Sequence, residues 1–341
     1  MVTSLAERVK QSGDPALALE LLAATTARAH VEAALSVLKR SALGERTLDD
    51  RARPVLRERL NFYFENTEKD RGATLREALV RLLVGINHPD DLDLYLRAVE
   101  VFEGIPPVPK IDVAQMLRAA ALVGISEVDA ELAQLHAVRL LSDVGNTSDF
   151  SGEPALTALH LLVRYERWQP IYQYALLVDG YKPEYADVVS RALESLPGDF
   201  PAALYAAAAR RFIERDGAVE QTGIVGYVVE HRREELYLLL EQIVAATRSG
   251  DLHRYAVIQM AAARDPALNE MLFALAKRCP VERAEFRRGA GTRARQRCRI
   301  EAAAGTNEIT SSPTPLTAWR GEKIIRLSRT GWDEVCFIPA A

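Results

Sequence analysis

The side chains of this chain that could bind a metal or form a disulfide are widely scattered. The histidines are His30, His88, His136, His160, His231 and His253. No two of them have the His-Glu-x-x-His spacing of a helical zinc site, and the three cysteines, Cys279, Cys298 and Cys336, include no Cys-x-x-Cys pair. We therefore expect no metal site and no disulfide framework, and this use of cysteine favours the cytoplasm.

Carboxylates that could act as general acids occur at Asp90, Asp91 and Asp93 and at Glu234-Glu235. Both groups stand where a helix is expected to begin, and the helix dipole stabilises negative charge in a first turn. The chain has no Gly-x-Ser-x-Gly elbow and no phosphate-binding loop of the Walker type. The Gly-x-Gly-x-x-Ala match at residues 289–294 follows an arginine run and not a strand. We expect no catalytic site, no enzymatic activity and no cofactor.

Aromatic residues are concentrated between residues 165 and 205, with arginines beside them. Tyrosine, tryptophan and arginine dominate many protein–protein interfaces because they combine a large apolar area with a polar end. The segment therefore predicts a partner-binding surface made of Arg164, Tyr165, Arg167, Trp168, Tyr172, Tyr174 and Tyr181. About half of the aromatic residues are expected to be core. Helical spacing puts Tyr172 and Ala175 on the side of Val178, so Trp168 and Tyr174 are predicted to be the exposed members.

Paired amphipathic helices are expected to position these residues. Leu156, Leu159 and Leu162 recur at helical spacing, and the pattern resumes after Pro170. Similar pairs occupy residues 75–102, 114–141, 188–212, 224–244 and 255–275. Prolines at 89, 170, 201 and 266 are expected to open second helices, and their separations fit repeat units of about 30 to 40 residues. Gly85-Ile86 also aligns with Gly124-Ile125 at an offset of 39 residues.

This pattern resembles the HEAT-like, armadillo-related family of α-helical repeats over residues 74–278. The resemblance implies an all-α chain in which antiparallel helix pairs stack into a solenoid that binds partners through its curved surface. The tetratricopeptide family is a rival interpretation, weakened because its Trp-Leu-Gly-Tyr pattern is absent. A compact all-α domain without repeats is the other alternative.

Composition divides the chain into four regions. Residues 1–72 are expected to form a helical cap, and 73–279 the repeat array, in which the proline-rich segment 104–110 is a helix breaker and a candidate flexion point. Residues 280–318 are an arginine-rich and then low-complexity linker, expected to be poorly ordered, and 319–341 are compatible with a small β-hairpin. No apolar run is long enough to suggest a membrane span.

Two functions from different classes follow. The first is a non-enzymatic scaffold or adaptor that binds a protein. The second is a nucleic-acid-associated protein, since HEAT-like repeats also occur in alkylpurine DNA glycosylases. Its nucleic-acid contacts would come from the basic segment 283–299, through Arg287, Arg288, Arg293, Arg295 and Arg297. The charge of residues 1–280, with 32 basic and 40 acidic residues, favours the first function.

Overall fold

The computed structural model describes residues 5–278, apart from 44–47, 49, 106–107, 144, 146, 149 and 179–184. The chain divides into one unit of Met1–Arg278 and a second of Cys279–Ala341. The predicted linker 280–318, the predicted hairpin 319–341, the five arginines proposed to contact nucleic acid and Tyr181 lie outside the described residues.

The described residues are helical apart from one short hairpin, as the sequence predicts. The helices are α1 (Leu5–Ser12), α2 (Pro15–Ala24), α3 (Arg28–Leu43), α4 (Arg53–Glu65), α5 (Thr74–Ile86), α6 (Leu92–Val99), α7 (Gln115–Val128), α8 (Ala130–Ser142), α9 (Ala155–Arg164), α10 (Trp168–Leu177), α11 (Ala186–Glu194), α12 (Ala202–Glu214), α13 (Ala218–Glu230), α14 (Tyr237–Ala246), α15 (Gly250–Ala262) and α16 (Pro266–Arg278). Short 3₁₀ turns include η2 (Thr67–Asp70), η3 (Pro89–Asp91) and η6 (Glu234–Leu236).

Proline and aspartate start several of these helices, as expected. Pro15 and Pro266 are the first residues of α2 and α16, and the Asp129 side chain caps α8 by accepting from the backbone N–H groups of Glu131 and Leu132. Pro170 differs, because α10 begins at Trp168 and not after the proline. A proline is tolerated there because the first turn of a helix has no internal acceptor for its N–H groups.

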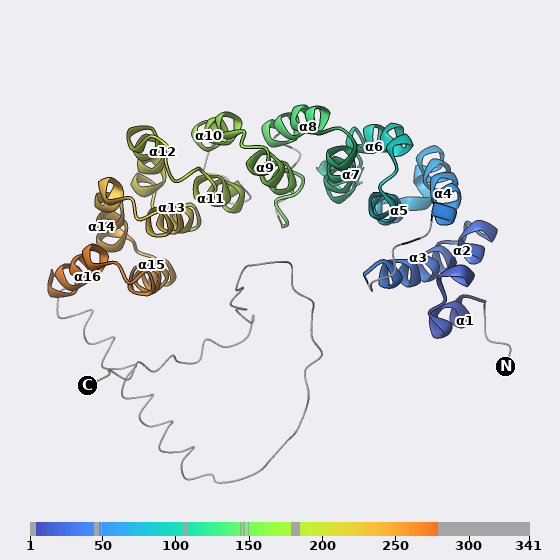
Figure 1. Cartoon of the computed structure of the whole chain (residues 1–341), viewed down its shortest axis with the longest axis horizontal. Coiled ribbons are helices and arrows are strands. Elements are labelled where there is room, and N and C mark those ends of the chain that lie inside the picture. The colour runs from blue at the N-terminus through green and yellow to red at the C-terminus, as the bar shows by residue number, and fades with distance from the viewer. Residues whose placement is uncertain are drawn as a thin grey trace, which may run out of the picture. The chain divides into compact units, whose positions relative to one another are not determined.

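Helices pack mainly against near neighbours in the chain. Each odd-numbered helix from α5 to α13 contacts the next odd-numbered helix, and α12, α14 and α16 do the same within the even-numbered set. Figure 1 shows the two sets from α4 to α16 as two adjacent rows. Buried apolar side chains form one continuous cluster from Val9 in α1 to Leu268 in α16. Each pair therefore buries its apolar face against the pairs before and after it.

Tyrosine hydroxyls link successive pairs at the spacing predicted for the repeat. The Tyr165 hydroxyl donates to the Ser126 carbonyl, 39 positions earlier, at 3.3 Å. The Tyr172 hydroxyl donates to the Leu204 carbonyl, 32 positions later, at 3.0 Å, and the Tyr227 hydroxyl donates to the Pro197 carbonyl, 30 positions earlier, at 2.8 Å. These bonds cross from one helix pair to the next.

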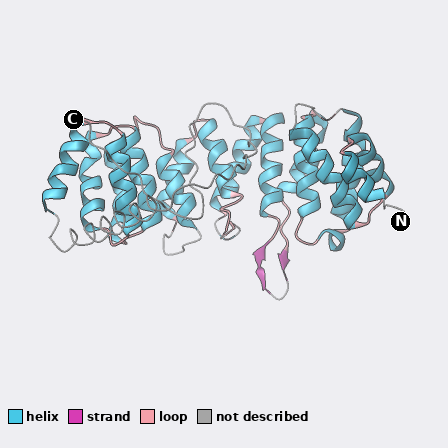
Figure 2. Cartoon of the chain, turned by 90° about the horizontal axis from the view of Figure 1, so that it is seen from below, coloured by secondary structure: helices cyan, strands magenta, loops and turns pink. Residues whose placement is uncertain are grey.

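The segment predicted as a breaker and flexion point forms an antiparallel hairpin of β1 (Gly104–Ile105) and β2 (Val108–Asp112). Figure 2 shows that the hairpin extends beyond the ends of the helices. Its base is anchored, because Asp112 Oδ1 accepts from the backbone N–H groups of Glu103 at 3.0 Å and Ala114 at 2.9 Å. The breaker is thus confirmed, and the base of the segment is tied to the helices on either side.

Glycine permits a close approach between α11 and α13. A Cβ placed on Gly223 in α13 would lie 2.0 Å from the carbonyl oxygen of Ser190 in α11. By contrast, a Cβ on Gly85 in α5 would meet no atom within 4 Å. The α11–α13 contact thus depends on the absence of a side chain at Gly223.

We predict that Gly223→Ala lowers the free energy of unfolding by about 1 to 3 kcal/mol, because the added methyl group forces the two helix backbones apart. Gly85→Ala is the matched control and should raise that free energy by about 0.5 kcal/mol, since alanine favours helix more than glycine does. Urea denaturation followed by circular dichroism measures both. Equal effects of the two substitutions would contradict the contact.

Candidate functional site

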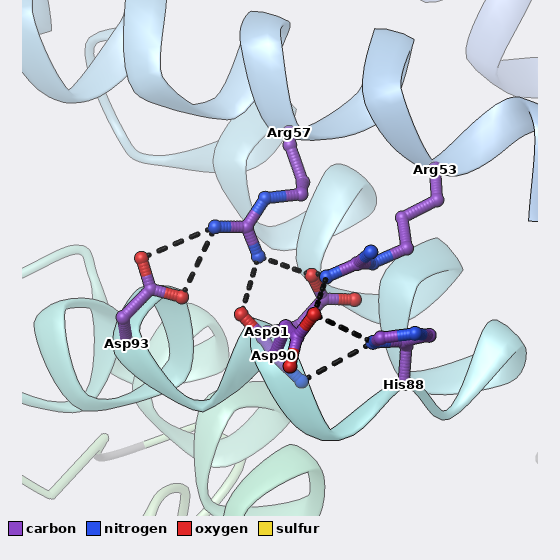
Figure 3. Close-up of polar contacts among 6 residues, drawn as sticks. All are labelled: Arg53, Arg57, His88, Asp90, Asp91 and Asp93. Carbon is purple, nitrogen blue, oxygen red and sulfur yellow. Dashed lines mark hydrogen bonds and ion pairs between the residues drawn. The ribbon is translucent and has the colours of Figure 1, made fainter.

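A cluster of charged side chains joins α4 to the segment that opens α6. Figure 3 shows Arg53 and Arg57 of α4 facing His88, Asp90, Asp91 and Asp93. Pro89 starts the 3₁₀ turn η3, and the His88 ring caps it, with Nδ1 accepting from the backbone N–H of Asp90 at 3.2 Å. This turn directs the Asp91 side chain inward while Asp90 stays 75% exposed.

Asp91 is the centre of this cluster and is fully buried. Its Oδ1 accepts from Arg53 Nε at 3.0 Å and from Arg57 Nη1, whereas its Oδ2 has no hydrogen-bond partner. Arg57 also donates to both carboxylate oxygens of Asp93 at 3.2 Å. Partial burial lowers the pKa of Arg57, but the hydrogen bond to Asp91 and the charges of Asp93 and Asp91 raise it above its ordinary value. Arg57 therefore stays charged.

The arrangement acts as a clamp between helices. Two arginines pair with Asp91 in a site where this carboxylate has no solvent contact, so it has no exposed face from which to transfer a proton to a substrate. From the sequence, the helix dipole alone explains these carboxylates, and Arg53 and Arg57 are not predicted as their partners. Their spacing of four residues, which puts both on one face of α4, is the signal that could have revealed the clamp.

Most of the predicted partner-binding residues also contact neighbouring helices. On the α7–α8 side, Arg164 pairs with Glu127 at 3.6 Å, and Arg167 Nε donates to Gln134 Oε1 at 2.6 Å. Tyr165 lies between them and bonds to α7 through Ser126. These contacts explain the aromatic and arginine content of the segment in part, because the side chains link one helix pair to the preceding one.

The remaining predicted residues lie on α10. Tyr172 packs its ring against Phe200 with centroids 5.1 Å apart, toward the following pair, and Trp168 is partly exposed. The prediction that Tyr174 is exposed is wrong, because its side chain is 5% exposed and burial raises its pKa. Ile171, Tyr174 and Ala175 share the buried face at spacings of three and four, whereas the prediction placed Tyr172 on that face. Arg164, Arg167, Trp168 and Tyr172 keep accessible surface.

A second aromatic contact, between α12 and α13, is not predicted from the sequence. The rings of Tyr205 in α12 and Tyr227 in α13 stack with centroids 4.0 Å apart and planes 14° apart, and His231 meets Tyr227 edge-on. Arg233 donates to the carbonyls of Gly198 and Phe200 and to the Tyr227 hydroxyl. Here too, aromatic rings and an arginine fasten one helix pair to the previous one.

Arg139 makes a comparable link from α8 to α6. Its guanidinium donates to Glu100 Oε2 at 2.9 Å and to the Val99 carbonyl at 3.1 Å, and lies 3.4 Å from His136 Nδ1. Burial, followed by the charge of Arg139, lowers the pKa of His136, and the Glu100 carboxylate opposes this only in part. His136 is therefore neutral at pH 7 and can accept from Arg139.

Comparisons with other proteins give no family for this chain. Searches against protein-family models, curated proteins and solved structures found no match. Within residues 5–278 as far as they are described, no group of three His, Cys, Asp or Glu side chains is placed to hold a metal ion. No helix of that part is long and apolar enough to cross a membrane.

We predict that Asp91→Ala lowers the free energy of unfolding by about 2 kcal/mol, because Arg53 and Arg57 would lose their shared partner in a site only partly open to water. Asp90→Ala removes a neighbouring carboxylate that is mostly exposed, and should change that free energy by less than about 0.5 kcal/mol. Thermal and urea unfolding of the two variants tests the difference. A larger effect of Asp90→Ala would show that the clamp is centred elsewhere.

We also predict that His136 makes stability fall as the pH drops below its ordinary pKa of 6.5. The folded-state pKa is lower than the unfolded one, so the unfolded chain takes up the proton first and stability is lost as the pH falls through this range. Urea midpoints at pH 7.5 and 5.5 should differ more for the wild type than for His136→Gln. An equal pH dependence in both would exclude His136 as the cause.

Proposed function

We propose that the chain is a HEAT-like α-solenoid that serves as a non-enzymatic scaffold or adaptor and binds a protein partner along its helical surface. The contacts between helix pairs support this proposal. Apolar packing and the hydrogen bonds of Tyr165, Tyr172 and Tyr227 join each pair to the next in chain order. An array built in this way grows along one axis and presents a long continuous surface.

The single observation that carries the proposal is the spacing of these links. Bonded residues in successive pairs are 39, 32 and 30 positions apart, which matches the length of one helix pair with its connections. Arg139 donates to the Val99 carbonyl, and Arg233 donates to the Phe200 carbonyl, at similar spacings. A compact all-α domain would not require links to recur at spacings of 30 to 40 positions, as they do between Val99 and Arg233.

The segment of Arg164 and Trp168 is the part of the predicted surface best suited to a partner. Arg164 is 62% exposed, and its ion pair with Glu127 is loose enough to exchange for another carboxylate. Trp168 is partly exposed and packs against the core, so its ring is held in place before binding. A tryptophan fixed beside an arginine is the usual composition of a binding hot spot.

We predict that Trp168→Ala raises the Kd for the native partner by about tenfold, the loss expected for a hot-spot side chain. The full chain is purified from its host with the protein that accompanies it, and affinity is measured with that protein isolated. Tyr174→Phe is the matched control, since it alters a buried aromatic residue of the same helix. Unchanged affinity in Trp168→Ala, or equal loss in both variants, would refute this surface.

A further inference from the structure

We propose that two copies of this chain associate through the exposed face of α16, with their α16 helices antiparallel about a two-fold axis. The occupant of this surface is thus a second copy of the chain. The proposal goes beyond the scaffold function, because it names a separate site at one end of the array, away from Arg164 and Trp168, and the partner that binds there.

Helix α16 is covered less well than the even-numbered helix before it. In α14, Leu240 and Ile243 are fully buried. In α16, Leu268 is buried, but Leu272 and Leu275 are only partly buried. Helix α14 has α16 packed beside it, whereas α16 is the last described helix, as Figure 1 shows. The array therefore ends in an apolar layer that another helix could cover.

The side of α16 that points away from its buried residue exposes a large apolar side chain next to a small one. Phe273 is 70% exposed, and Glu270 and Ala274 are exposed as well. These three positions recur at helical spacing and therefore share one face. In α15, the other helix of this last pair, Ile258 is 49% exposed. A phenylalanine beside an alanine gives this face a projection with a space next to it.

The array begins with a different kind of surface. Helix α1 exposes mainly polar side chains, and Leu5 is the one large apolar residue that it exposes. The exposed polar residues are Glu7, Arg8, Lys10, Gln11 and Ser12. A head-to-tail contact would set these polar groups against the apolar face of α16 and remove them from water. A two-fold contact, in which the same apolar face is used twice, avoids this cost.

The order of residues along α16 matches this face to its own copy. A two-fold axis between positions 273 and 274 places Phe273 of each copy on Ala274 of the other, so a large side chain meets a small one twice. The same axis sets position 270 opposite position 277, which are glutamate and lysine in the sequence. Within one helix these two positions are about 10 Å apart. The opposite charges therefore meet between copies, and this complementarity identifies a second copy as the occupant.

Sedimentation equilibrium of the full chain tests the pairing, and a monomer–dimer equilibrium is expected. Phe273→Ser should raise the dimer Kd by about a hundredfold, since it removes a side chain worth about tenfold from each of the two copies. Leu135→Ser is the matched control and should leave the Kd unchanged, because Leu135 is 65% exposed in the middle of α8. Circular dichroism checks that both variants keep their helices.

A charge exchange tests the register of the pairing. Glu270→Lys and Lys277→Glu should each raise the dimer Kd by about tenfold at low salt, because each places like charges opposite one another at both ends of the contact. The double variant restores opposite charges and should return to within about threefold of the wild type. An unspecific apolar contact would not produce this recovery.

Three results would overturn the proposal. The first is a monomer at every concentration, as expected if another protein or another part of the chain covers α16. The second is equal weakening of the dimer by Leu135→Ser and Phe273→Ser, and the third is a double charge variant that dimerises no better than the single variants. Trp168→Ala tests the first surface separately, because it should weaken the native partner and leave the dimer Kd unchanged.

Discussion

Everything else in this structure depends on the burial of an apolar helix face against the next helix pair. No pair can hide its own apolar side chains, so Leu79, Leu122 and Leu159, each in a different pair, are buried only because neighbouring pairs cover them. Removing one contact therefore exposes apolar surface on both sides of it. A substitution therefore lowers stability most at the contacts between helix pairs, and not at a single central core.

Polar groups add direction to this nonspecific attraction. Apolar faces can slide past one another, but a tyrosine hydroxyl that donates to one carbonyl, as Tyr227 does to Pro197, is satisfied in one register only. The same holds for the clamp of Arg53 and Arg57 on Asp91, where displacement would leave a buried charge without a partner. The arginines and tyrosines that suggest a binding surface in the sequence thus serve first to align successive pairs.

Side chains that align helix pairs are hard to distinguish in the sequence from side chains available for binding. Both roles use arginine and aromatic residues. Tyr172 and Trp168 are near neighbours on α10, yet the Tyr172 hydroxyl is bonded to the Leu204 carbonyl, while Trp168 stays partly exposed. A partner can bind only to side chains that the contacts between helix pairs leave exposed. Phe150, which is fully exposed, and Leu177, which is 71% exposed, are such side chains.

The sequence by itself determined the helices and their amphipathic faces, because apolar periodicity and helix-start residues such as Asp14-Pro15 act over a few neighbouring positions. It also aligned Gly85 with Gly124, but only the tertiary structure shows that Gly124 packs against the Tyr95 ring while Gly85 faces open space. Likewise, Tyr174 lies on the buried face of α10, where the sequence pattern predicted Tyr172, and Tyr172 is partly exposed. Which side chain of a helix is buried depends on how that helix is rotated against residues 30 to 40 positions away. Local sequence patterns carry no information over that distance.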